Sequence, residues 1–197
     1  MPAADRRITA ADIVPDAVFS VQRKARRAAL LPAKRLRRIA LGPYCTVYFE
    51  SFETMLFQVQ EMLLVEKGGE AQLADELAAY NPMIPQGAEL TATLMFEIDD
   101  PLSRARALGQ LGGVEDRFFL EIDGARAAAA PEADIERTRE DGKTSAVHFL
   151  HFPLTPAQVA AFRTPGARVL LGCDHALYAH LAILGEDSRA EMARDLA

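Results

Sequence analysis

The stretch from Gly42 to Gly69, GPYCTVYFESFETMLFQVQEMLLVEKGG, decides the fold that we expect. We predict one long helix here, because Pro43 suits the first position of a helix and the Gly68-Gly69 pair suits its end. At 100° per residue, the apolar side chains fall on one arc and the polar side chains on the other. The apolar arc must be buried, so the rest of the chain is expected to pack on this helix.

The segments on either side of this stretch supply shorter helices and several strands. Helical spacing, capping residues and helix-ending prolines predict helices over residues 15–31, 69–80, 101–111, 155–162 and 186–196. Alternation with β-branched and aromatic content predicts strands over residues 38–41, 89–99, 116–123, 145–152 and 167–173. Residues 177–183 fit a strand or a helix, and residues 124–144 are expected to form an exposed, mobile excursion.

The order of these elements favours an α+β fold. Helices come first and strands later, without the regular alternation that builds a parallel sheet. We predict an antiparallel sheet of four to five strands packed against one long central helix and several shorter helices.

The length and composition favour one soluble domain. Half of the 197 residues are hydrophobic, and no linker divides the chain, so residues 1–197 are expected to share one core. The start of the chain is polar, and no apolar run reaches the ~20 residues that span a bilayer, which favours a cytoplasmic protein without a membrane partner. Cys45 and Cys173 form no CxxC pattern, so the chain is not expected to hold an iron–sulfur cluster of its own. A net charge of -6 argues against nucleic-acid binding.

One face of the predicted long helix is acidic. Glu50, Glu53 and Glu61 fall within one sector, and clustered carboxylates are typical ligands of a divalent metal ion. His175 follows a predicted strand and could complete such a site, whereas His148 shares a face with apolar residues and is more typical of a core histidine. A metal site formed by Glu50, Glu53, Glu61 and His175 is therefore one hypothesis. The alternative is a solvated face that is balanced by basic residues.

Residues 23–38 form a basic segment with eight Lys or Arg residues and no acidic residue. Adjacent Arg37 and Arg38 could bind a phosphate or carboxylate through their guanidinium groups, or pair with the acids of the helix. Tyr80 and Asn81 begin a stiff, proline-rich turn whose polar side chains could line a pocket or simply end a helix. Nucleotide-binding, nucleophile-elbow and HExxH motifs do not occur, so no catalytic residue is singled out.

Several segments of the sequence together resemble a bacterial family of proteins that carry a domain of unknown function. These segments are RRIALGP, FESFETMLFQVQEMLLVE, ELAAYNPMIP, ELTATLMFEID, EDGKTSAVHFLHF and DHALY. Genes of that family often lie beside genes for rubrerythrin-like proteins and for heterodisulfide-reductase-like iron–sulfur proteins, which implies a role near peroxide defence or electron transfer. By matching position, the resemblance emphasises Arg37, Arg38, Glu50, Glu53, Gln58, Glu61, Met62, Tyr80, Asn81 and His175.

Three hypotheses about function follow. The first is a non-catalytic accessory protein, a homodimer, that assists a redox partner such as a rubrerythrin-like or iron–sulfur protein. The second is a metal-binding protein or metalloenzyme that uses the carboxylates of the long helix. The third is an anion or nucleotide sensor that acts through Arg37 and Arg38. The candidate ligand-binding residues as a whole are Arg37, Arg38, Gln58, Tyr80 and Asn81.

Overall fold

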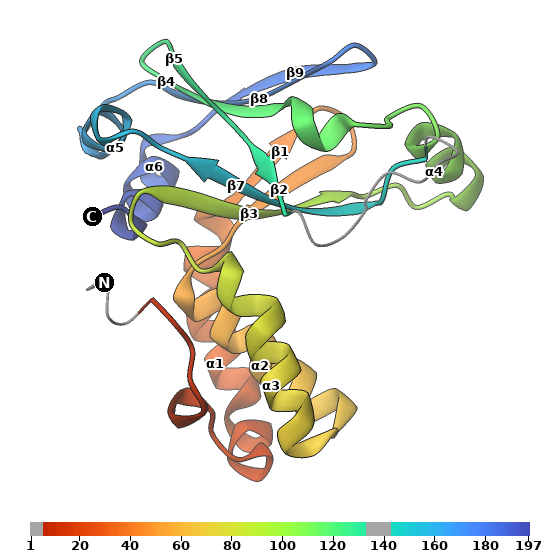
Figure 1. Cartoon of the computed structure of the whole chain (residues 1–197), viewed down its shortest axis with the longest axis vertical. Helices are drawn as coiled ribbons and strands as arrows, with labels where there is room; N and C mark the ends of the chain where they lie inside the picture. Colours follow the sequence, from red (N-terminus) through yellow and green to blue (C-terminus); the bar gives the residue numbers. More distant parts are fainter. Residues whose placement is uncertain (1–5, 133–142) are drawn as a thin grey trace.

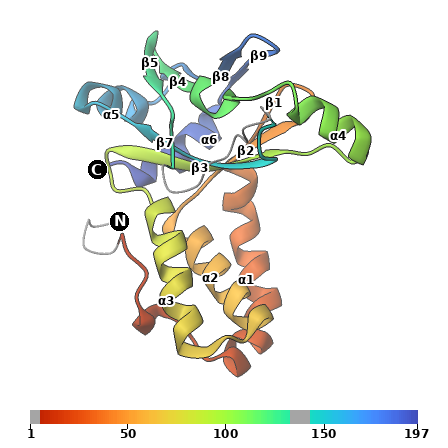
Figure 2. The same cartoon turned by 45° about the vertical axis from the view of Figure 1, so that its right-hand side comes forward.

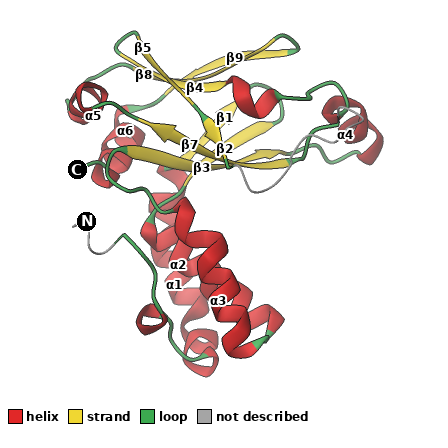
Figure 3. Ribbon diagram, viewed as in Figure 1, coloured by secondary structure: helices red, strands yellow, loops and turns green. Residues whose placement is uncertain are grey.

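The computed structural model describes residues 6–132 and 143–197, and consists of two antiparallel sheets above a bundle of three helices (Figure 1). The predicted α+β class is confirmed. The helices are α1 (Asp16–Leu36), α2 (Phe52–Glu66), α3 (Gly69–Tyr80), α4 (Pro101–Leu108), α5 (Pro156–Arg163) and α6 (Glu186–Met192). Figure 3 shows that α1, α2 and α3 gather at one end of the molecule and that the strands occupy the other.

The strands form two sheets whose inner faces share the main core. The first sheet has the order β1 (Arg38–Leu41), β2 (Cys45–Phe49), β3 (Glu89–Phe96), β7 (Val147–Pro153) and β6 (Ala130–Pro131). The second has the order β5 (Ala125–Ala128), β4 (Phe118–Ile122), β8 (Val169–His175) and β9 (Tyr178–Ile183). Alternate residues such as Val47, Leu94 and Leu120 point between the sheets and are fully buried.

The predicted long helix over residues 42–69 is wrong in its first third. Cys45–Phe49 is strand β2, which pairs with β1 on one side and β3 on the other. Gly42 adopts φ +69° in the turn before it, a conformation that favours glycine. The helix begins only at Phe52, after Ser51, whose Oγ accepts a hydrogen bond from the main-chain N–H of Thr54 at 3.3 Å.

The first helix is longer than predicted. Pro32 was expected to end it, but α1 continues through Pro32 to Leu36 and becomes the longest helix among the described residues. Pro32 is exposed, so its ring faces solvent while α1 packs on α2 through other residues. Phe19 is the buried residue of α1, and its ring meets the edge of Phe57 of α2 at 5.7 Å between centroids.

The bundle has a core of its own and meets the first sheet on its outer face (Figure 2). Val59 of α2 and Met83, in the turn after α3, lie at its centre, and Phe149 of β7 packs against the same cluster. The outer face of the first sheet therefore meets helices at one end only, which creates a corner between the sheet and the bundle.

The other predicted elements are confirmed with boundary shifts of a few residues. Residues 177–183, which fit either a strand or a helix from the sequence, contain β9. The exposed excursion expected over residues 124–144 begins instead with β5 and β6. The rest of that excursion, residues 133–142, lies outside the described residues. Within the described ranges, none of the helices combines the length and hydrophobicity that a membrane span requires.

Candidate functional site

A pocket of about 320 Å³ lies in the corner between the first sheet and the bundle, and we call it the corner pocket. Its sheet wall follows from strand alternation, because residues opposite the main core must face outward. Tyr48 pairs with Thr93, and Thr93 pairs with Phe149, so these three side chains form one row across β2, β3 and β7. Its other walls come from the helices and the turn after α3, and include Lys34, Met55, Gln58, Tyr80 and Met83.

Glu50 is the buried acid of this pocket. It follows β2 directly, and the residue is only 8% exposed. One carboxylate oxygen accepts a hydrogen bond from the Thr54 hydroxyl at 2.6 Å, and the other accepts one from the Thr93 hydroxyl at 2.7 Å. Within the part of the chain that the structure describes, Glu50 forms no ion pair. The carboxylate is held firmly, but its charge is not neutralised by a neighbouring cation.

The main chain of Glu50 is fixed as well. Its N–H donates to the carbonyl of Thr91 at 2.9 Å, and its carbonyl accepts from the Arg37 guanidinium at 2.9 Å. Since the residue that carries the carboxylate is anchored to β3 and to the end of α1, the carboxylate has a preorganised position.

Two other residues selected from the sequence lie in the same pocket. The amide nitrogen of Gln58 donates to the hydroxyl of Tyr80 at 3.5 Å. Both side chains are partly buried, and both line the corner pocket with Glu50. The structure thus brings together Glu50 from the residue after β2, Gln58 from α2 and Tyr80 from α3.

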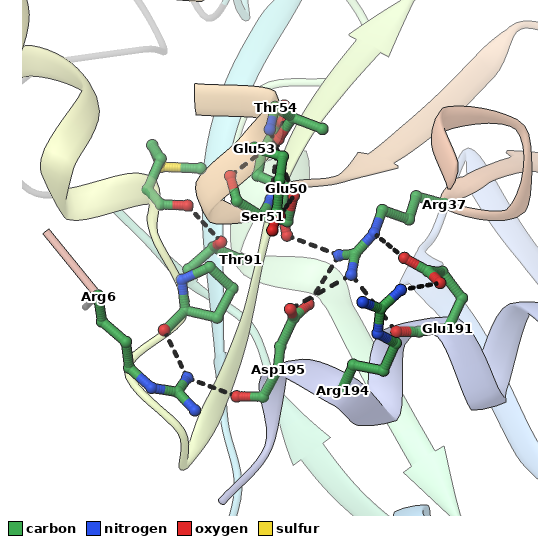
Figure 4. Close-up of polar contacts among 12 residues, drawn as sticks. Arg6, Arg37, Glu50, Ser51, Glu53, Thr54, Thr91, Glu191, Arg194 and Asp195 are labelled. Atoms are coloured by element: carbon green, nitrogen blue, oxygen red, sulfur yellow. Dashed lines mark hydrogen bonds and ion pairs between the residues drawn. The ribbon is translucent and has the colours of Figure 1, made fainter. Parts of the chain in front are cut away.

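Arg37 lies at the edge of the corner pocket but uses its guanidinium elsewhere (Figure 4). It is 4% exposed, and its five N–H groups donate to the carbonyl of Glu50, to both carboxylate oxygens of Asp195, and to the side chain and carbonyl of Glu191. Burial acts to lower the pKa of Arg37, but the hydrogen bonds and charges of Asp195 and Glu191 outweigh it and raise the pKa. Arg37 therefore clamps the C-terminal residues to the junction of sheet and bundle.

Arg38 and Asn81 have partners of different kinds. Arg38 is exposed and contacts Tyr48 and Glu97 on the outer face of the first sheet. A hydrogen bond from Thr46, helped by Tyr48 and Arg38, lowers the pKa of the Glu97 carboxyl. The amide of Asn81 bonds both the N–H and the carbonyl of residue 8, so it holds the N-terminal segment against the bundle.

The structure does not bring the four hypothetical metal ligands together. Glu53 is exposed and accepts from the Ser51 hydroxyl, and Glu61 forms an ion pair with Arg23 at 2.5 Å. His175 ends β8 in the second sheet, where its ring accepts from the N–H of Leu177. Among the described residues, no group of three or more His, Cys, Asp or Glu side chains is placed to hold a metal ion.

Glu50, Glu53 and Glu61 do not form one acidic face of a helix, as the sequence predicted. Glu50 lies before the helix, Glu53 is at its first turn, and Glu61 faces α1. His148, the other histidine considered, is fully buried, with its ring nitrogen 3.1 Å from the Thr144 hydroxyl. This position agrees with the core histidine that its strand face predicted.

The family described as "Protein of unknown function (DUF3501)" matches residues 7–196 of the chain. This chain belongs to the DUF3501 family. It is also similar to the crystal structure, at 1.90 Å resolution, of a novel protein of unknown function from Burkholderia pseudomallei K96243. The two chains are 36% identical with a TM-score of 0.89, and the similarity covers 96% of this chain and 99% of the other. The comparison with curated proteins gives no match.

Several pocket residues of this DUF3501 chain were missed by the sequence reasoning. Thr93 and Met95 lie on one face of a correctly predicted strand, so their shared direction could have been noticed. Ser51 followed by Thr54 is a helix-start signal that would have placed Glu50 outside the helix. Met83 gave no such signal, because its place in the pocket depends on how α3 packs.

Proposed function

We propose that this DUF3501 chain is a non-catalytic binding protein and that the corner pocket is its small-molecule site. One observation supports this most directly: the Glu50 carboxylate faces a pocket of about 320 Å³, is 8% exposed, and forms no ion pair with the described residues. Withdrawing a carboxylate from water costs several kcal/mol unless hydrogen bonds or an opposite charge compensate. The two threonine hydroxyls compensate in part, and a ligand that donates to Glu50 would complete the set.

The lining of the corner pocket supports the same proposal. Ligand pockets are typically about 300–1,000 Å³, mostly apolar, with a few placed polar groups. Here Met55, Met83 and Phe149 provide apolar surface, and Gln58 and Tyr80 provide hydrogen-bonding groups. Methionine side chains adapt to irregular shapes, which suits a recognition surface.

We further propose that ligand binding serves an accessory role in the cytoplasm, beside a rubrerythrin-like or iron–sulfur redox partner. The support is the family resemblance of the sequence and its implied gene neighbours. Affinity purification from a native host under gentle conditions is the test, and failure to recover either kind of partner would count against this role.

The metal and anion hypotheses draw less support from the geometry. A metal site would need Glu50 to act without Glu61 and His175, which lie apart from it. An anion site would have to use Arg38, because every N–H group of Arg37 already has an acceptor. Metal analysis of protein purified without a chelator tests the metal hypothesis. A stoichiometric bound ion would support that hypothesis.

A fragment screen by thermal shift tests the small-molecule site. We expect some fragments to raise the melting temperature of the wild type, and to lose this effect in Met95→Trp, because the larger ring fills the pocket. Leu102→Trp is the matched control, since it adds the same side chain at an exposed position of α4. The proposal is wrong if no fragment binds the wild type, or if the same fragments bind Met95→Trp equally well.

A further inference from the structure

We propose that the ligand of the corner pocket carries a positively charged nitrogen group, an ammonium or amidinium, that pairs with the Glu50 carboxylate. This inference rests on the small-molecule site proposed above and adds the charge and size of its ligand. It follows from the charges around Glu50, from the unused acceptor positions of its carboxylate, and from the surface that surrounds it.

Glu50 differs from other acids of the chain in its partners. Glu61, Glu191 and Asp195 are more exposed than Glu50, yet each forms an ion pair with an arginine. Glu50 has only hydroxyl partners for its carboxylate. Glu76 is 9% exposed and also forms no ion pair with the described residues, but it does not line the corner pocket. Glu50 combines burial, the lack of a cationic partner among the described residues and a place in a pocket, so a cation is the partner that suits this site.

The cationic groups nearest to Glu50 do not supply that charge. Arg37 donates to the main-chain carbonyl of Glu50, and its own charge is matched by Asp195 and Glu191. Lys34 also lines the pocket, is exposed, and forms no ion pair with the described residues. Neither cation is therefore paired with the Glu50 carboxylate.

The Glu50 carboxylate has acceptor positions that no described residue uses. A carboxylate has about four lone-pair positions, and Thr54 and Thr93 each use one, on different oxygens. Both oxygens of Glu50 can accept a further hydrogen bond, which is the pattern that a two-pronged amidinium or a three-donor ammonium satisfies. A neutral hydroxyl would supply one donor and leave the charge unmatched.

The ligand also needs an apolar group. Met55, Met83, Met95 and Phe149 line the same pocket as Glu50 and give it apolar surface. A volume of about 320 Å³ lies at the lower end of the range of about 300–1,000 Å³ for small-molecule pockets. The ligand that fits is a small aromatic or branched aliphatic amine or amidine.

Isothermal titration with matched probes tests this inference on the intact chain. The probes are 2-phenylethylamine, its neutral analogue 2-phenylethanol, and 3-phenylpropionate. We expect the amine to bind at least about 10-fold more tightly than the alcohol, because a hydrogen bond between two charged groups is stronger than one from a neutral hydroxyl. The carboxylate probe is expected to bind most weakly.

Variants separate the role of charge from the role of shape. Glu50→Gln should weaken the amine by about 10-fold or more and leave the alcohol within about 2-fold. Glu61→Gln, the matched control, removes the same charge from α2 outside the pocket and should change neither affinity. Circular dichroism and melting temperature establish that both variants are folded.

The outcomes distinguish the two proposals. Equal binding of amine and alcohol to the wild type would overturn the cationic ligand and leave the small-molecule site intact, and so would an unchanged amine affinity in a folded Glu50→Gln. No binding of any probe, together with a failed fragment screen, would overturn both. The wild-type comparison of amine and alcohol stands even if Glu50→Gln does not fold.

Discussion

Replacing Arg37 by methionine tests whether this residue holds the fold together or is reserved for a ligand. Methionine keeps much of the length of the side chain but removes the charge and all five N–H donors. The substitution leaves the carboxylates of Asp195 and Glu191 and the carbonyl of Glu50 without the donor that they share (Figure 4). Arg194 still pairs with Glu191, so Asp195 is the group most affected.

The magnitude follows from burial. Arg37 is 4% exposed and its two acidic partners are 14% exposed, so the pairs are shielded from water. Removal of one partner of a buried ion pair costs about 3–5 kcal/mol, a large part of the roughly 5–15 kcal/mol that stabilises a domain. We therefore expect Arg37→Met to lower the free energy of unfolding by about 4 kcal/mol and, at about 2–4 °C per kcal/mol, the melting temperature by about 10 °C.

Urea unfolding followed by circular dichroism measures this loss, with Arg38→Met as the control. Arg38 is the next residue, is 52% exposed, and pairs with Glu97 at 3.4 Å, so its loss should cost less than about 1 kcal/mol. In a double-mutant cycle, Asp195→Asn should cost much less in the Arg37→Met background than in the wild type. A loss below about 1 kcal/mol for Arg37→Met, or equal losses for both arginines, would refute the clamp.

Three further predictions concern other parts of the molecule. The hydrogen bond from His151 to Glu89, at 3.0 Å, raises the pKa of His151, so its stabilising effect is present at pH values below the unfolded pKa and is lost as pH rises through the folded pKa. NMR titration should show a lower His151 pKa in Glu89→Gln, and an unchanged value would contradict this pairing. Gly42→Ala should lower the free energy of unfolding by at least about 1 kcal/mol, because φ at this residue is +69° and a Cβ would lie against the ring of His180. Urea unfolding measures this loss, and an unchanged free energy of unfolding would show that the turn can relax. The homodimer expected from the sequence remains a proposal, and the edge strand β9, where Leu181 is 63% exposed, is its candidate surface. Sedimentation velocity should show a dimer that Leu181→Lys converts to monomers, and identical behaviour of the two proteins would contradict this.

Local signals predicted the elements that depend on local interactions. Helix α5 begins where Thr155 offers a capping hydroxyl, which accepts from the N–H of Gln158 at 3.3 Å. Helix α3 ends at the Asn81-Pro82 pair, and β3 follows the alternation of its residues. The cap of α5, the end of α3 and the alternation of β3 each involve residues that are close in sequence, so the neighbouring residues were enough to predict them.

The error over residues 42–69 has a definite cause. Apolar residues at positions 45, 48, 49 and 52 fit a helical stripe, while those at 45, 47 and 49 fit strand alternation equally well. Backbone pairing decides between the two, because Val47 lies between Ile39 of β1 and Leu94 of β3. That pairing depends on distant segments and is invisible in the periodicity of the stretch itself.

In the candidate site, too, some features follow from the sequence and others depend on tertiary structure. The sequence by itself determined the reasons for which the three residues were selected: Glu50 for its place among clustered carboxylates, Tyr80 for its place at a proline-rich turn, and Gln58 for its match to the family. Tertiary structure decided which of the selected residues meet: Thr93 reaches Glu50 across 43 positions of sequence, and Asp195 reaches Arg37 across 158. Local propensity acts over a few residues, whereas the burial that gives a carboxylate or a guanidinium its role is produced only when remote segments pack together and exclude water.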